Sequence, residues 1–415
     1  MGSIGVSMSN LKKSAAEKEE RVLNIKYLLA MALYLCTYCA IVVFASVYLL
    51  AKGYSNFTIG CSFALVSLLV ILTQPVIAAV ADNRRGREVI KLITIFLLVS
   101  IVASGQMLFL KMPSPFLLPL FMIVEYCLLI IQPLINALAF VFEPSGVRIH
   151  FGMARGCGSA VFGIVSVLLG RVIVQEGVDA IPAVYFAANA FLIFVIYNYG
   201  KEMKLGQARS VETQTSSLPL GMFCKKYKRF IFFIFGTIFV YFSHVIIFNY
   251  FIHIVTMVGG TENDMGKAIF LSTMLEAVAT VLLPFIIKRT GCSVLLKVAA
   301  VMFIVRNIIM CAASNLSWIY IGSAFQLVSY AIMYPGSIYY ANLVVSRQDR
   351  VKSQALVAMN YTASGIFASL AGGAVIDLYG IRQALVLGTA ASCIGAVLIF
   401  LSVEEKKEAQ DLSGG

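Results

Sequence analysis

Five ionisable side chains lie within long apolar stretches of this sequence, and they are the residues best suited to chemistry. They are Glu125, Arg155, His244, Glu276 and Arg306. A charge in apolar surroundings is costly unless it is paired or faces water, so such residues mark candidate functional sites. A carboxylate can exchange a proton for an arginine partner, an imidazole titrates near neutral pH, and a guanidinium presents a planar fork to oxygen-rich groups. This set suits proton exchange and ligand binding.

Polar and aromatic side chains accompany these charges. Tyr34 and Tyr38 lie one helical turn apart in the first apolar stretch, too deep for residues at a membrane interface. Gln326 and Tyr330 lie two turns and one turn before residues 334–336, Tyr-Pro-Gly, which we expect to loosen their helix. Asp377, near the end of a late apolar stretch, is expected to be structural. We predict that Tyr34, Tyr38, Gln326 and Tyr330 line a ligand cavity.

Other chemistry is absent from the sequence. Cys36 and Cys39 form a C-x-x-C pair, but they lie inside the first apolar stretch and are interpreted as small apolar residues on one helix face. The sequence contains no Cys/His cluster, no phosphate-binding Walker motif and no H-E-x-x-H. We therefore expect no metal, no cofactor and no enzymatic activity.

The elements that carry these residues are predicted to be membrane-spanning helices. The 415 residues are 60% hydrophobic and only 13% charged, and apolar runs of 20 or more residues recur. Such runs cross about 30 Å of hydrocarbon as helices, whereas barrel strands would alternate with period two. We predict an all-α membrane protein with twelve spans, at roughly 27–51, 57–81, 89–110, 116–142, 151–174, 181–200, 230–258, 265–287, 294–314, 317–345, 354–379 and 383–403.

The spans are predicted to form two six-helix bundles, 27–200 and 230–403. The polar segment 201–229 joins them, and polar tails occupy 1–26 and 404–415. The first tail has no apolar core or cleavage site, so we expect no cleaved signal peptide.

Positive charge is distributed very unequally between the two sides. With the N-terminus inside, 25 Lys and Arg residues lie on its side and four lie in the opposite loops. This asymmetry predicts that both termini and the 201–229 linker lie in the cytoplasm. The short loops and the lack of paired cysteines suit a plasma membrane. The net charge of +12 is therefore a topology signal, and we expect no nucleic-acid partner.

An internal repeat supports the two bundles. Three pairs of positions are separated by 206 residues, namely Gly53 and Gly259, Gly60 and Gly266, and Asp82 and Lys288. Each set brackets an outer loop, a whole span and the start of a basic inner loop. Duplicated units of this kind are typical of transporters with a site at the repeat interface.

The segment "AAVADNRRGR" resembles the signature G-x-x-x-D-R-x-G-R of the major facilitator superfamily. Asp82, Gly86 and Arg87 match it and are implied to form a gating motif. The segment departs from the signature because Ala78 replaces the first glycine and one extra residue follows Asp82.

"FGMARGCGSAVFG" resembles the span-5 motif of the lactose permease branch, which includes oligosaccharide, nucleoside and phenylpropionate proton symporters. The resemblance implies that Arg155 binds substrate, that Phe162 stacks on it and that Arg306 serves proton coupling. The branch has a carboxylate where this chain has Asn136, and a His and Glu where it has Gln326 and Ser329. Its span-8 glutamate aligns with Thr273, three residues before Glu276.

These observations predict a secondary active transporter that moves a small hydroxylated, sugar-like solute by alternating access and proton symport. The alternatives are an importer of nucleosides or aromatic carboxylates, and a non-transporting membrane sensor or channel on the same fold. The expected partners are the solute, a proton and the lipid bilayer, and the chain is expected to be a monomer. The predicted substrate-binding residues are Arg155, Phe162, Tyr34, Tyr38, Asn136, Gln326 and Tyr330. The predicted coupling residues are Glu276, Arg306, Glu125 and His244.

Overall fold

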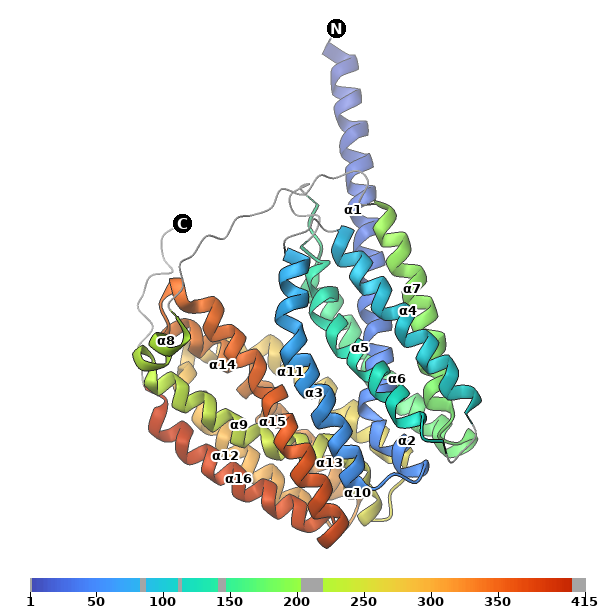
Figure 1. The fold of residues 1–415 in the computed structure, drawn as a ribbon. Helices are drawn as coiled ribbons and strands as arrows, with labels where there is room; N and C mark the ends of the chain where they lie inside the picture. Colours follow the sequence, from blue (N-terminus) through green and yellow to red (C-terminus); the bar gives the residue numbers. More distant parts are fainter. Residues whose placement is uncertain (1, 83–86, 111–113, 141–146, 203–218, 405–415) are drawn as a thin grey trace. The chain divides into compact units, whose positions relative to one another are not determined.

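The computed structural model describes residues 2–82, 87–110, 114–140, 147–202 and 219–404, and it is built of helices (Figure 1). Within these residues, 12 segments are long and apolar enough to cross a membrane, which confirms the predicted all-α, twelve-span fold. Helices form because the bilayer core offers no water to the backbone, so each span must satisfy its own N–H and C=O groups.

The first half of the chain contains α1 (Gly2–Tyr38), a π-helical turn (Cys39–Val43), α2 (Ala45–Ala51), α3 (Asn56–Asp82), α4 (Arg87–Phe109), α5 (Leu117–Ala137), α6 (Phe151–Glu176) and α7 (Ala180–Glu202). The first helix begins at Gly2, so helical structure extends through most of the segment predicted to be a tail.

The second half contains α8 (Leu220–Lys226), α9 (Lys228–Asn249), α10 (Phe251–Met257), α11 (Glu262–Thr290), α12 (Cys292–Cys311), α13 (Leu316–Ala324), a 3₁₀ turn (Phe325–Leu327), α14 (Tyr330–Val344), a second 3₁₀ turn (Arg347–Asp349), α15 (Arg350–Tyr379) and α16 (Ile381–Ser402).

The 206-residue repeat is visible in the helix bounds. The short helices α2 and α10 occupy equivalent positions at this offset, and α3 and α11 begin at equivalent residues. The turns between them use Gly53 and Gly259, whose φ angles of 88° and 79° lie in the left-handed region that favours glycine. The two copies of the repeat therefore share local backbone conformation as well as sequence.

Gly60 and Gly266 are the second pair in the repeat, and both allow helices to cross at close range. A Cβ atom at Gly60 would lie 2.1 Å from the carbonyl oxygen of Ser369 on α15. A Cβ atom at Gly266 would lie 2.1 Å from the carbonyl oxygen of Ser166 on α6. Since lipid is as apolar as the side chains, helices associate through such close backbone packing rather than through burial from water.

The chain divides into two compact units that do not coincide with the two halves. Unit 1 comprises Met1–Val42, Leu72–Val165 and Asp179–Glu212, and unit 2 comprises Val43–Ile71, Ser166–Val178 and Thr213–Gly415. The first turns of α3 and the last turns of α6 thus belong with the second-half helices.

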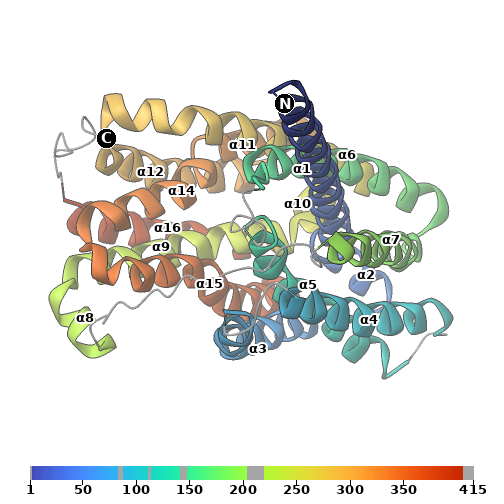
Figure 2. The ribbon, with the colours of Figure 1, turned by 90° about the horizontal axis from the view of Figure 1, so that it is seen from above.

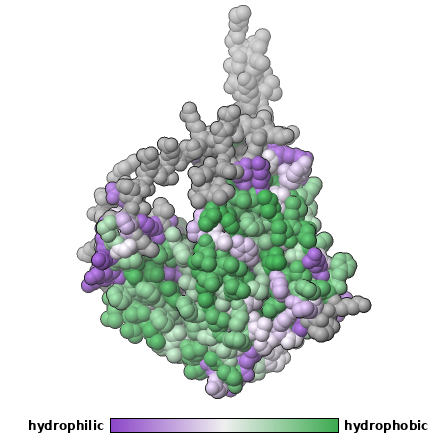
Figure 3. Space-filling view, in the orientation of Figure 1, coloured by the Kyte–Doolittle hydropathy of each residue, from purple (hydrophilic) through white to green (hydrophobic). Residues whose placement is uncertain are grey.

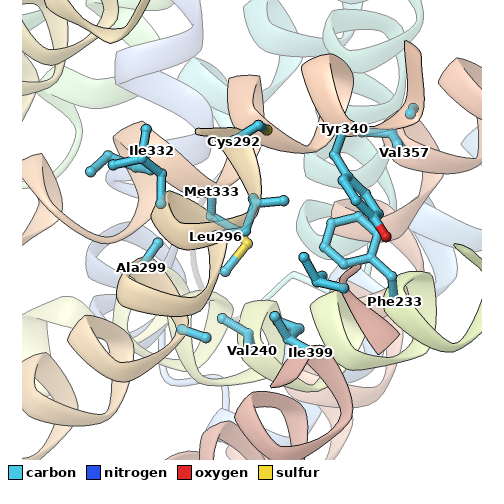
Figure 4. Packing of buried hydrophobic residues seen from close by; sticks show 14 of the residues in the cluster. Phe233, Val240, Cys292, Leu296, Ala299, Ile332, Met333, Tyr340, Val357 and Ile399 are labelled. Atoms are coloured by element: carbon cyan, nitrogen blue, oxygen red, sulfur yellow. The ribbon is translucent and has the colours of Figure 1, made fainter. Parts of the chain in front are cut away.

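Unit 2 has a buried hydrophobic cluster built mainly from α9, α12, α14 and α16, with members from α8, α11 and α15 (Figure 4). Phe233 and Tyr340 pack edge to face there, with ring centroids 4.9 Å apart. Helix α9 lies beside α15 and α16 (Figure 2), and Gly236 faces Gly395 where α9 crosses α16. Hydrogen bonds tie the same helices together, including one of 2.7 Å from Asn360 to Thr237.

Large hydrophobic side chains remain exposed along the helices, among them Leu72, Val102, Phe285 and Leu401. In the view of Figure 3 the surface over the helices is largely hydrophobic, and hydrophilic residues gather near helix ends. A surface of this kind suits contact with lipid chains.

The expected loosening at residues 334–336 is wrong in its position. Helix α14 continues through Pro335, and the span instead breaks at the Phe325–Leu327 turn, where Ser329 has φ −108° and ψ −89°. Proline removes one backbone donor but leaves the rest of the helical ladder intact. The break earlier in the span places Gln326 outside regular α-helix, and its side chain makes contacts described below.

Candidate functional site

A polar network in unit 2, fully buried at His244 and Arg306, joins four of the predicted site residues. Arg306 Nη1 lies 2.8 Å from His244 Nδ1, and Arg306 Nη2 donates to Gln326 Oε1 at 3.1 Å. Gln326 Nε2 in turn donates to Glu276 Oε2 at 2.9 Å. Since a guanidinium only donates, His244 Nδ1 accepts, and the imidazole carries its proton on Nε2. The network thus runs from a carboxylate to a neutral imidazole through one amide and one guanidinium.

Three helices and one 3₁₀ turn position this network. His244 lies on α9, Arg306 on α12, Glu276 on α11 and Gln326 in the turn before α14. His244 and Arg306 are 3% and 4% exposed, whereas Glu276 and Gln326 are only partly buried. Glu276 and Arg306 are both predicted coupling residues, and in the structure Gln326 links them. Gln326 was predicted to bind solute, so its place in the network is a new observation.

Aromatic rings enclose the imidazole. His244 stacks on Tyr330 with ring centroids 4.4 Å apart and an angle of 8° between the planes. Tyr361 on α15 approaches both rings edge-on, at 6.0 Å from His244 and 6.1 Å from Tyr330. Sequence reasoning did not select Tyr361; its hydroxyl in the middle of an apolar stretch was the available signal. These contacts hold the imidazole in one orientation toward Arg306.

Unit 1 brings together the residues around the glycine-rich start of α6. Tyr38 at the end of α1 faces Phe162 on α6, with ring centroids 6.4 Å apart. Glu125 on α5 and Arg155 on α6 lie within electrostatic range of the Tyr38 hydroxyl. Tyr34 is enclosed, and its hydroxyl donates to the carbonyl oxygen of Leu128 at 3.3 Å, which ties α1 to α5.

Gly158 explains why the start of α6 is rich in glycine. A Cβ atom at Gly158 would lie 2.7 Å from Leu35 Cδ1 and 3.1 Å from Met31 Cγ, both on α1. The missing side chain therefore lets α6 approach α1, which carries Tyr38 toward Phe162 and Arg155.

The remaining predicted residues are Asn136 and the three residues of the gating motif. Asn136 lies in the last turn of α5 and is half-buried. Of the predicted gating motif, Gly86 lies outside the described residues, as do the side chains of Asp82 and Arg87.

A second polar group lies in unit 2, where α3 begins and α15 ends, and the sequence did not predict it. Asp377 Oδ1 accepts hydrogen bonds from Asn56 N at 3.1 Å and from Asn56 Nδ2 at 2.8 Å, and Oδ2 accepts from Phe57 N at 2.7 Å. His253 Nε2 lies 2.6 Å from Asn56 Oδ1. Burial lowers the pKa of His253, and the nearby Asp377 carboxylate opposes that shift. The Asp377 carboxylate thus caps α3 from another helix.

A family model described as the MFS_1 like family matches residues 23–386. Among solved structures, a variant of the nucleoside transporter NupG has a TM-score of 0.77 at 15% identity, covering 92% of this chain and 100% of its own. A bacterial homologue of the iron transporter ferroportin in an inward-facing state has a TM-score of 0.69 at 13% identity, covering 92% and 99%.

A POT family transporter in complex with 5-aminolevulinic acid has a TM-score of 0.68 at 11% identity, covering 92% of this chain and 96% of its own. No curated protein sequence matches the chain significantly. At these identities the solved structures show the fold alone, and together with the family match they confirm the major facilitator fold predicted from the sequence.

Proposed function

The chain belongs to the MFS_1 like family, and from that premise we propose that it is a secondary active transporter. It moves a small hydroxylated, sugar-like solute across the plasma membrane by alternating access, and a proton travels with the solute. Both termini and the linker lie in the cytoplasm. The observation that carries the proposal is the buried network from Glu276 through Gln326 and Arg306 to His244.

This network has the properties of a coupling device. An ionised Glu276 compensates the charge of Arg306 through the Gln326 amide, and His244 offers that charge only a neutral acceptor. A proton on Glu276 removes the compensation, and an uncompensated buried guanidinium is strongly unfavourable. The protonated and ionised states therefore favour different arrangements of α11, α12 and the 3₁₀ turn, which is the differential stabilisation that coupling needs.

The solute contacts proposed for unit 1 are Arg155, Phe162 and Tyr38. The guanidinium binds paired oxygens of the solute, and the aromatic rings pack against its apolar face. Their common location beside the close α1–α6 packing supports this assignment. Nucleosides and aromatic carboxylates would satisfy the same groups, so they belong in the same test.

Arg155→Lys tests the proposal in proteoliposomes by counterflow of labelled sugars, nucleosides and aromatic acids. Lysine keeps the charge and loses the planar fork. We expect exchange of the transported solute to fall by about 10-fold or more, because one or two charge-assisted hydrogen bonds to the solute are lost. Arg171→Lys, at an exposed position of the same helix, is the matched control and should exchange normally.

Two outcomes would contradict the proposal at different points. Normal exchange by Arg155→Lys would remove Arg155 from the solute site and leave transport intact. Binding of a solute without any exchange by the wild-type protein would instead favour a membrane sensor.

A further inference from the structure

Two charged side chains in unit 1 have buried atoms without partners. Glu125 is 5% exposed, and its Oε2 atom makes no hydrogen bond to any described residue. The buried Nη1 atom of Arg155 likewise finds no hydrogen-bond partner within the described part of the chain. Buried polar atoms of folded proteins are nearly always satisfied, so each such atom needs an explanation.

The two unsatisfied groups lie near one aromatic side chain, Tyr38 on α1. Glu125 comes from α5 and Arg155 from α6, and both charges are within electrostatic range of the Tyr38 hydroxyl. The α1–α5 contact between Tyr34 and Leu128 lies one turn from Glu125, and the Tyr38–Phe162 contact lies two turns from Arg155. Three packed helices therefore hold the carboxyl and the guanidinium around the same aromatic side chain.

The side chains around Tyr38 do not neutralise each other in pairs. Within the described residues no salt bridge joins Glu125 to Arg155. Breaking or omitting one partner of a buried charge is much more costly than a missing neutral hydrogen bond. A ligand that brings one group of each polarity would satisfy both side chains at once, and a neutral hydroxyl would compensate a full charge less well.

We propose that Glu125 is a solute-binding residue and that the transported solute carries an ammonium group next to an oxygen acceptor. The ammonium donates to Glu125 Oε2, and a hydroxyl or carboxylate oxygen accepts from Arg155 Nη1. The Tyr38 and Phe162 rings pack against the carbon skeleton between these two groups. This inference rests on the proposed transport function and assigns it aminated solutes: amino sugars, which fall within the proposed class, or small amino acids, which would extend it.

The same geometry assigns Glu125 and Glu276 to different tasks. Glu276 already accepts a hydrogen bond from Gln326 and lies in the network with Arg306, so its charge has partners inside the protein. Glu125 Oε2 has none among the described residues, and the proposal assigns the ammonium group of the solute to it. The inference therefore places the proton in unit 2 and the ammonium in unit 1.

Matched probe pairs on the purified full-length protein test the inference by thermal shift. The pairs are glucosamine with glucose, glucosamine with N-acetylglucosamine, and β-alanine with propionate. We expect an aminated member to stabilise the wild-type protein, and its partner without the ammonium to stabilise it far less. Glu125→Gln, which has nearly the same shape, should weaken binding of the aminated probe by about 10- to 100-fold. The exposed Glu176→Gln is the control and should bind as wild type.

Each remaining outcome overturns the inference. If no aminated probe stabilises the protein, or if glucose and propionate act as well as their partners, the ammonium is not recognised. If Glu125→Gln binds the aminated probe normally but loses uphill accumulation, Glu125 carries the proton instead. Counterflow of glucose by the wild-type protein would show that transport stands although the aminated class is wrong, so the two failures are distinguishable.

Discussion

At the residue scale, charge compensation decides how the intramembrane residues act. Glu276 and Arg306 are linked by a glutamine whose amide both donates and accepts, so a change at either end is felt at the other. In a medium of low dielectric constant, the hydrogen bonds within such a network polarise one another. His244 terminates the network as an acceptor and is held by its stack on Tyr330.

Glu276→Gln should separate exchange from accumulation. Glutamine mimics the protonated acid permanently, and its carbonyl oxygen can still accept from Gln326. Exchange needs no net proton movement, so counterflow should remain within about two-fold of wild type, whereas uphill uptake driven by an imposed pH step should vanish. Both modes can be measured in the same proteoliposomes. A glutamine variant that still accumulates solute would remove Glu276 as the coupling acid, and His244 would be tested next.

At the element scale, interruptions of the helices lie beside the polar residues of both units. The π-helical turn follows Tyr38 directly, and the 3₁₀ turn contains Gln326. Irregular turns of this type recur at functional sites because they release backbone groups and redirect side chains. The N-terminus of α3 is a further example, since its free N–H groups are satisfied by Asp377 from α15 rather than by a local cap.

Asp377→Asn should loosen the packing of α3 against α15. The amide keeps the shape but loses the negative charge at the helix N-terminus, and its Nδ2 cannot accept from Phe57 N. A loss of about 1–2 kcal/mol is expected from one cap with charge-assisted hydrogen bonds. Alkylation of Cys61, next to Gly60 on α3, should therefore become about 10-fold faster with an impermeant reagent added outside.

Site-specific mass spectrometry measures this rate in intact cells. Glu176→Gln removes a carboxylate at an exposed position of α6 and should leave the rate unchanged. An Asp377→Asn protein with the wild-type rate would show that the cap does not hold α3 and α15 together.

At the scale of the whole molecule, duplication and charge distribution set the architecture. The repeat reproduces α2 and α3 as α10 and α11 with the same spacing and with the same left-handed glycines. The basic segments lie on one side of the predicted topology. The repeat and the distribution of basic residues can both be read from the linear sequence, and neither depends on which solute the protein carries.

The predicted orientation is testable with single cysteines and an impermeant thiol reagent. A cysteine at Glu176, the exposed last residue of α6, should be labelled from outside. A cysteine at position 210, in the predicted cytoplasmic linker, should react only after the cells are permeabilised. The parent protein, whose nine native cysteines stay in place, provides the background signal. Labelling in the opposite pattern would reverse the whole topology.

The sequence alone determined the number of spans, the helical class, the repeat and the charged residues that need explaining. These follow from local composition, because the bilayer thickness sets helix length and the missing water makes every intramembrane charge conspicuous. Arg155, Glu276, Arg306 and His244 could be selected for that reason.

Only the tertiary structure decided which of these residues act together. Asp377 accepts a hydrogen bond from Asn56, which lies 321 positions earlier in the chain. Gln326 donates a hydrogen bond to Glu276, which lies 50 positions earlier. Contacts of this range depend on how helices cross, and no period or motif in the sequence encodes them. For the same reason the prediction placed the helix break at residues 334–336, whereas the structure has it at Phe325–Leu327. Proline is visible in the sequence, but the packing that bends a helix elsewhere is not.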